Sequence, residues 1–318
     1  MEYWFQRRVL VTGGAGFVGS QLAIRLVREG ALVTVLDNLF TGDLHNLEPI
    51  KGRYTFVQGS VTSKVLMDSM VPNYDVVFHL AVRNIMVSTH QPELDLFCNT
   101  GGTLRILMGA RRTNTKVVYT SSVSIHGQAR QLPINAHTPA SLLSPYAVSK
   151  LAAEQYCSMA YRLWKVATVV VRLSNCYGPG QSPSNAYCGV IGKFLEAARK
   201  REPLIVYGSG RQTRDYVYVD DTVEALLMAA ENPSMVGNTV ALGTGHEESV
   251  RSLAQRVQQL CGVTTTRLTR KRDIDTVVRR VVDPAWAAST LGWRAKIRLG
   301  RGLAYTWKWL QDETHPDA

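Results

Sequence analysis

The chain has 318 residues, of which 45% are hydrophobic and 19% are charged, with a formal net charge of +11. This length allows a substantial core in one large domain or two moderate ones, and the composition excludes extended disorder. The 36 Lys and Arg residues are spread along the chain rather than gathered in a tail or stripe, which argues against nucleic acid and favours an anionic small substrate.

Short apolar runs alternate with helical patterns over the first 174 residues. The runs expected to be strands are residues 9–12, 32–37, 54–58, 75–80, 116–121 and 166–173, and the expected helices are residues 17–28, 64–70, 92–112 and 145–163. The strands are apolar throughout rather than alternating, as strands covered on both faces must be. The pattern predicts an α/β fold, a doubly wound parallel sheet of Rossmann type, in residues 1–174.

After residue 174 this alternation gives way to a stretch rich in Gly, Pro, Ser and Asn at residues 174–185. We expect shorter and more irregular elements beyond it, in a smaller C-terminal lobe of residues 175–318 that packs over the ligand. Some elements of this lobe, such as a helix at residues 221–231, are expected to return to the larger domain.

No apolar run is long enough to span a membrane, and the first eight residues lack the apolar core of a signal peptide. We therefore expect a cytoplasmic protein without a membrane partner. The five cysteines are widely spaced, with no Cys-x-x-Cys pair and no nearby histidine. We expect free thiols and no metal site.

The first expected strand leads into a glycine-rich loop, GGAGFVG, at residues 13–19. The helix after this loop would aim its free N–H groups and positive dipole end at it, an arrangement that holds a pyrophosphate. Asp37 closes the second strand, where a carboxylate can accept hydrogen bonds from both ribose hydroxyls. Such a carboxylate repels a 2′-phosphate, so the sequence favours NAD over NADP. The alternative is that Asp37 and Asn38 only end a strand in a turn.

Tyr146 and Lys150 are four residues apart at the start of an expected helix, so both side chains project from one face. A neighbouring ammonium, helped by a positive nicotinamide ring, would favour the phenolate and lower the pKa of the tyrosine. Ser122, at the end of the fifth strand, would share the substrate hydroxyl with the tyrosine. A second Tyr-x-x-x-Lys pair, Tyr161 and Lys165, falls where that helix ends, and we interpret it as a chance match.

Several motifs together resemble those of the extended short-chain dehydrogenase/reductases, in the NAD-dependent nucleotide-sugar epimerase/dehydratase family that includes UDP-glucose 4-epimerase. The motifs are TGGAGFVG at 12–19, DN at 37–38, HLA at 79–81, YTSS at 119–122, SPYAVSK at 144–150, RLSNCYGP at 172–179, RDYVYVDD at 214–221 and LGW at 291–293. The resemblance covers nearly the whole chain and is more specific for the family than for the substrate.

The resemblance implies a catalytic triad, a set of NAD contacts and a set of substrate contacts. The triad is Ser122, Tyr146 and Lys150. The NAD contacts are Gly13, Gly16, Phe17, Val18, Gly19, Asp37, Asn38, Ser60, Val61, Leu80, Ala81, Asn99, Tyr146, Lys150 and Ser174. The contacts with a nucleotide-diphosphate sugar are Ser122, Asn175, Val190, Tyr207, Arg214, Arg272 and Asp275, and Asn175 and Arg214 would hold its pyrophosphate. A homodimer formed through the helices at 92–112 and 145–163 is also implied.

Some of these assignments have alternatives. Arg83, also counted among the substrate contacts, could pair with a sugar carboxylate or be a packing residue. Arg272 could belong to a solvated charge run instead. Ser60 replaces an aspartate that usually contacts the adenine, which alters that contact but keeps a hydroxyl. His126 replaces a tyrosine, and it could touch the substrate or be a satisfied loop histidine.

The residues after the catalytic serine bear on the reaction. Related dehydratases carry an Asp-Glu pair there and decarboxylases a glutamate, whereas Ser122 is followed by Val123 and Ser124. This favours 4-epimerisation of a UDP-hexose or UDP-uronate, by oxidation at C4, rotation of the keto sugar and return of the hydride. A 4,6-dehydratase or UDP-glucuronate decarboxylase that uses an acid from elsewhere is the alternative. A non-catalytic NAD-sensing protein would be expected to have lost Tyr146 or Lys150.

Overall fold

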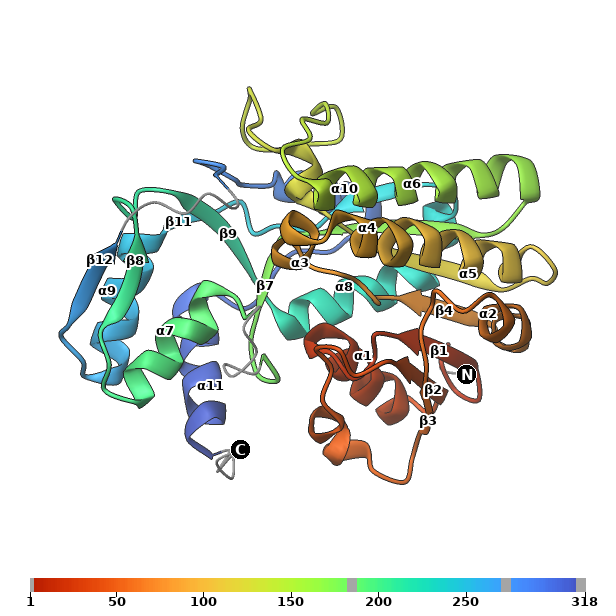
Figure 1. Ribbon diagram of the computed structural model, residues 1–318, viewed down its shortest axis with the longest axis horizontal. Helices are drawn as coiled ribbons and strands as arrows, with labels where there is room; N and C mark the ends of the chain where they lie inside the picture. The colour runs from red at the N-terminus through yellow and green to blue at the C-terminus, as the bar shows by residue number, and fades with distance from the viewer. Residues whose placement is uncertain (1–2, 182–187, 270–275, 313–318) are drawn as a thin grey trace.

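The computed structural model describes residues 3–181, 188–269 and 276–312. Within these residues the main element is a parallel sheet of seven strands in the order β10-β6-β5-β4-β1-β2-β3 (Figure 1). Its strands are β1 (Arg8–Thr12), β2 (Leu32–Asp37), β3 (Thr55–Gln58), β4 (Val76–His79), β5 (Lys116–Ser122), β6 (Thr168–Leu173) and β10 (Thr239–Ala241). Strand order reverses beside β1, which pairs with β2 and with β4. The predicted doubly wound sheet is confirmed, and its switch point lies where such folds bind ligands.

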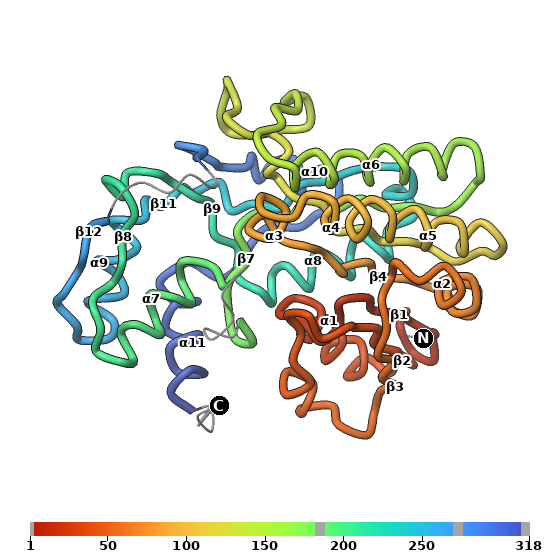
Figure 2. The backbone as a smooth tube through the Cα atoms, in the orientation of Figure 1, coloured from red at the N-terminus to blue at the C-terminus, as the bar shows by residue number. Residues whose placement is uncertain are grey.

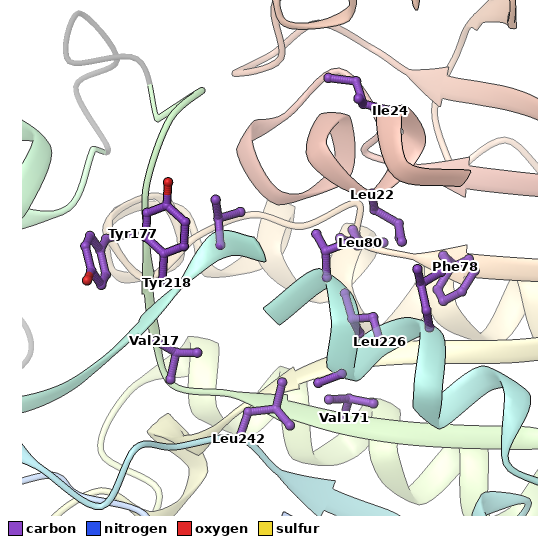
Figure 3. Packing of buried hydrophobic residues seen from close by; sticks show 14 of the residues in the cluster. Leu22, Ile24, Phe78, Leu80, Val171, Tyr177, Val217, Tyr218, Leu226 and Leu242 are labelled. Carbon is purple, nitrogen blue, oxygen red and sulfur yellow. The ribbon is translucent and has the colours of Figure 1, made fainter. Parts of the chain in front are cut away.

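Helices cover both faces of the sheet because its strands are apolar on both faces. One face packs against α1 (Phe17–Arg28) and α8 (Val219–Glu231). The other packs against α2 (Lys64–Met70), α5 (Gly102–Ala110) and α6 (Pro145–Trp164). In the first layer Leu226 of α8 belongs to the same buried cluster as Phe78 of β4 and Val171 of β6 (Figure 3). The two layers hold the sheet fixed beneath the loops at its carboxyl edge.

The helices between β4 and β6 differ in detail from the prediction. The expected helix at 92–112 consists of α4 (Pro92–Asp95), a π-helical segment η3 (Leu96–Gly101) and α5, and an unpredicted helix α3 (Ile85–His90) precedes it. α6 begins as expected, because Ser144 accepts a hydrogen bond from the amide of Ala147 at 3.1 Å and Pro145 takes the first helical position.

The described residues after 174 form two smaller sheets with helices around them. The strands are β7 (Asn175–Tyr177), β8 (Leu204–Tyr207), β9 (Thr213–Tyr218), β11 (Glu247–Ser249) and β12 (Thr266–Thr269), and the helices are α7 (Val190–Arg199), α9 (Val250–Cys261), α10 (Pro284–Leu291) and α11 (Leu299–Asp312). The expectation of short, irregular elements holds for these strands but is wrong for the helices, which reach 14 residues in α11. Figure 2 shows β7 between the other strands of these sheets and the large sheet.

Two segments from this second half join the large sheet. β10 pairs with β6, and α8 packs on the face that α1 also covers. The domain boundary near residue 174 stays a prediction. The described residues also contain the short 3-10 helices η1 (Leu44–Ile50), η2 (Val71–Asn73), η4 (Val123–His126) and η5 (Pro233–Met235).

All five cysteines are free thiols. In the described part of the chain no group of three or more His, Cys, Asp or Glu side chains could hold a metal ion. Nor does any described helix combine the length and hydropathy that crossing a membrane would require.

Candidate active site

A cavity of about 710 Å³ lies at the carboxyl ends of the strands around β1. Its volume is within the usual range for small-molecule sites. The sequence-predicted residues that line it are Gly13, Gly16, Phe17, Val18, Gly19, Asp37, Asn38, Ser60, Val61, Leu80, Ala81, Arg83, Ser122, Tyr146, Lys150 and Ser174. The fold thus brings the predicted triad into the same cavity as most of the predicted dinucleotide contacts.

The glycine loop at 13–19 makes a turn that other residues would block. Gly13 has a φ of +70°, and a Cβ there would lie 2.7 Å from the amide nitrogen of Ala81. A Cβ on Gly19 would collide with the carbonyl oxygen of Gly13. The first turn of α1 has no side-chain cap at Gly16 and no acidic residue, so its amides and positive dipole end face the cavity. These features fit the pyrophosphate of a dinucleotide.

Asp37 is buried at the edge of the cavity, and backbone amides orient its carboxylate. One oxygen, Oδ2, accepts a hydrogen bond from Ala15 at 3.0 Å, and Oδ1 accepts one from Leu39 at 2.8 Å. Each carboxylate oxygen has a second lone pair, so both can still accept hydrogen bonds from ribose hydroxyls. The geometry fits the expected contact with the adenosine ribose.

The triad residues come from β5 and the first two turns of α6. Ser122 donates a hydrogen bond from Oγ to Ser124 Oγ at 3.0 Å and accepts one from the Ser124 amide at 3.1 Å. Lys150 Nζ donates to the carbonyl of Thr120 at 2.8 Å and lies 5.8 Å from the centroid of the Tyr146 ring. Backbone and hydroxyl contacts therefore hold Ser122 and Lys150 in place at the cavity that Tyr146 also lines.

Burial dominates the proton affinities at this site. It raises the pKa of Tyr146 to about 12, although a hydrogen bond from Ser122 and the charge of Arg280 act to lower it. Burial also lowers the pKa of Lys150 to about 8. In this structure burial is the largest influence on the pKa of Tyr146, while the Lys150 ammonium lies 5.8 Å from the ring centroid and donates to the carbonyl of Thr120. The expected lowering of that pKa by Lys150 together with the nicotinamide ring stays a prediction.

Asn99 lies behind the cavity wall and is fully buried. Its side chain accepts a hydrogen bond from the Arg83 amide at 2.7 Å and donates to the Arg83 carbonyl at 3.0 Å. It also donates to Ser149 Oγ at 3.2 Å and to the carboxylate of Asp95. In this structure Asn99 fixes the loop after β4, and its direct contact with NAD stays a prediction.

Four of the predicted substrate residues are not among the described residues that line this cavity. Two more predicted substrate residues lie outside the described part of the chain. The four are Asn175 on β7, Val190 at the start of α7, Tyr207 at the end of β8 and Arg214 on β9. The buried guanidinium of Arg214 donates from Nη1 to the carbonyls of Thr213 at 2.8 Å and Val277 at 3.0 Å. Arg272 and Asp275 are the two that fall outside. All six assignments stay predictions.

Sequence reasoning missed Phe40, Gln181 and Cys188, which also line the cavity, and the buried Arg280. No local pattern in the sequence places Gln181 or Cys188 at the cavity. In the sequence Arg280 is the second residue of an Arg-Arg pair, one of several such pairs along the chain. Nothing in the sequence indicates that it is buried near the predicted triad.

His126 is a satisfied loop histidine, one of the two interpretations left open. It is buried, with Nδ1 3.2 Å from the carbonyl of Pro139 and Nε2 3.3 Å from a guanidinium nitrogen of Arg172. The same guanidinium makes a bidentate ion pair with Glu154, at 2.9 and 2.7 Å. Burial and the charge of Arg172 lower the pKa of His126.

Comparisons with known proteins agree with this arrangement. The sequence model described as "NAD dependent epimerase/dehydratase family" matches residues 9–243. The chain is 34% identical to a putative UDP-glucose 4-epimerase of Methanocaldococcus jannaschii, over 96% of this chain and 98% of that protein. It is 34% identical to UDP-N-acetyl-alpha-D-glucosaminuronate decarboxylase of Bacillus cytotoxicus, over 80% of each. The crystal structure of UDP-glucose 4-epimerase from Thermotoga maritima with UDP-glucose has a TM-score of 0.90 and 30% identity, covering 96% of this chain and 98% of that one.

Proposed function

Since this chain belongs to the NAD dependent epimerase/dehydratase family, we propose that it is a nucleotide-sugar 4-epimerase acting on a UDP-hexose or UDP-uronate. The distribution of carboxylates around the cavity carries the proposal. Among the described lining residues the carboxylates are Asp37 and Asp43, and both lie on the dinucleotide side with the glycine loop. Elimination of water or loss of CO2 needs a further acid or base at the sugar, whereas 4-epimerisation needs none.

The triad supplies the proton chemistry. NAD, held by the glycine loop and Asp37, would supply the hydride acceptor for C4 of the sugar and the donor for its return. The pKa of about 12 keeps Tyr146 a phenol in this structure, so its role as base requires that the positive nicotinamide ring and Lys150 favour the phenolate once NAD is bound. The phenolate oxygen would then take the proton of the C4 hydroxyl, and Ser122, held by Ser124, hydrogen-bonds the same hydroxyl. Lys150 has a pKa of about 8, so it is mostly protonated at neutral pH and keeps a positive charge near the phenol. After rotation of the keto sugar, Tyr146 would return the proton to the C4 oxygen while the hydride is restored to the other face of C4.

A product assay tests this function. The purified protein is incubated, without added NAD, with UDP-glucose, UDP-galactose, UDP-N-acetylglucosamine or UDP-glucuronate, and the products are separated by chromatography and mass spectrometry. We expect a C4 stereoisomer of equal mass from at least one substrate. A 4-keto-6-deoxy product or released CO2 would contradict the proposal and would match the decarboxylase and dehydratase relatives.

We also propose that the chain forms the homodimer that the resemblance implied. Phe97 of η3 and Val148 of α6 are 63% and 51% exposed, on elements that contact each other. Exposed apolar side chains on adjoining helices are typical of an interface. Replacing both by Arg is expected to halve the mass measured by sedimentation, and an unchanged dimer would exclude this surface.

A further inference from the structure

Two side chains from different loops meet at the cavity. The guanidinium carbon of Arg83, in the loop after β4, lies 3.6 Å from the centroid of the Phe40 ring, in the loop after β2. Both residues line the cavity together with the glycine loop. In the sheet, β1 lies between β2 and β4. The contact, here called the Arg83–Phe40 bridge, therefore joins loops on either side of the strand that carries the glycine loop.

Both of these loops are anchored to the glycine loop itself. On the β4 side the backbone of Ala81 packs so closely on Gly13 that a Cβ there would lie 2.7 Å from the Ala81 nitrogen. On the β2 side the carbonyl of Ala15 accepts hydrogen bonds from the Asp43 amide at 2.9 Å and from Asn46 Nδ2 at 3.0 Å. The bridge is thus held near the glycine loop by contacts on both sides.

The backbone of each partner is also held. Asn99 pairs with both the amide and the carbonyl of Arg83, at 2.7 and 3.0 Å. The amide of Phe40 donates to Asn38 Oδ1 at 3.2 Å. By contrast, the Phe40 side chain is 45% exposed and the Arg83 side chain is partly exposed, so neither is needed to fill the core. The backbones are therefore held by hydrogen bonds, whereas the two side chains are partly exposed at the cavity.

The chemistry of the bridge suits a diphosphate. A guanidinium stacked on an aromatic ring keeps its N–H groups in its own plane, where they can pair with phosphate oxygens as a fork. The first turn of α1, which has no side-chain cap and no acidic residue, adds positive potential at the glycine loop. We propose that Arg83 is a cofactor-retaining residue, whose guanidinium, stacked on Phe40, closes over the diphosphate of bound NAD and slows its release. The inference rests on the dinucleotide of the family and not on which sugar is turned over.

The rate of NAD release tests the proposal. NAD-loaded protein is diluted into excess ADP-ribose, and released NAD is measured over time in wild type, Arg83→Gln, Phe40→Ala and the double variant. Each single substitution is expected to speed release about fivefold to thirtyfold. The double variant is expected to release NAD no faster than the faster single variant, since both substitutions remove one interaction. Arg111→Gln is the matched control, because Arg111 lies 5.0 Å from the Trp164 ring and does not line the cavity.

Two results would overturn the proposal. One is release within twofold of wild type in Arg83→Gln and Phe40→Ala, with unchanged melting temperatures. The other is unchanged release together with a raised KM for UDP-glucuronate but not for UDP-glucose, which would assign Arg83 to the sugar. Phe40→Ala alters an exposed side chain and still tests the bridge if Arg83→Gln does not fold. Since release is measured without sugar, it stays readable even if the epimerase assay fails.

Discussion

The buried His79 makes the stability of the protein depend on pH in a way that can be calculated. Its Nδ1 lies 2.8 Å from Thr12 Oγ1 and its Nε2 lies 3.0 Å from Thr103 Oγ1. The hydroxyl of Thr103 donates to the carbonyl of Asn99 at 2.6 Å, so its oxygen accepts from Nε2–H, and Nδ1 accepts from Thr12. The network thus fits a neutral ring, and burial lowers the pKa of His79 to about 3.

A group whose pKa is lower in the folded than in the unfolded state stabilises the protein above its unfolded pKa and loses that contribution as the pH falls. An unfolded histidine has a pKa of about 6.5. As the pH falls from about 7.5 to 5, His79 therefore becomes protonated in the unfolded chain but stays neutral in the folded protein. The free energy of unfolding should fall by about 2 kcal/mol from this residue alone, and the result is insensitive to the folded pKa while that stays below about 4.

Urea unfolding of wild type and His79→Gln at both pH values measures this contribution at fixed protein concentration. His79→Gln is expected to lose about 2 kcal/mol less stability on acidification than wild type. His137→Gln, at an exposed position, serves as the control and should behave as wild type. A pH-dependent loss in His79→Gln that stays within about 0.5 kcal/mol of the wild-type loss would refute the reasoning.

Three further substitutions test the site and its support. Tyr146→Phe is expected to lower kcat about 10²- to 10⁴-fold while NAD stays bound, as measured by product formation and cofactor content; near-normal turnover would remove Tyr146 as the base. Glu154→Gln breaks the bidentate pair between buried Glu154 and partly buried Arg172 and should cost about 3–5 kcal/mol in urea unfolding, so a loss under about 1 kcal/mol would contradict that estimate. Gly19→Ala should yield protein purified without NAD, whereas Gly300→Ala, with open space around its Cβ, should retain it, and equal NAD contents would exclude the steric argument.

Much of the large sheet could be predicted because its signals are local. α1 and α2 have the predicted bounds, and β1 to β6 begin and end within two residues of the prediction. The expectation beyond residue 174 failed for the helices, because a Gly- and Pro-rich stretch only interrupts the pattern and does not determine the structure of later residues. In α9 the buried residues Val250, Leu253, Ala254 and Val257 have the spacing of an amphipathic helix, a signal that was available.

The candidate site was likewise predictable only in part from the sequence. Ser122 and Asp37 could be placed because parallel strands bring their carboxyl ends to one edge of a sheet. Phe40 and Cys188 come from loops whose course depends on tertiary packing, and no spacing in the sequence brings them to the cavity. The raised pKa of Tyr146 depends on burial, which the Tyr-x-x-x-Lys spacing does not report.

The return of β10 and α8 to the large sheet limits how this protein can be recombined. A chimera that joins residues 1–174 to the second half of a relative must import a foreign edge partner for β6 and a foreign cover for one sheet face. Chimeras made to alter sugar preference are therefore expected to fold when they keep α8 and β10 of this chain and replace only the segments around these two elements. Sequence changes in the segments around α8 and β10 are thus easier to accommodate than replacement of the whole second half of the chain.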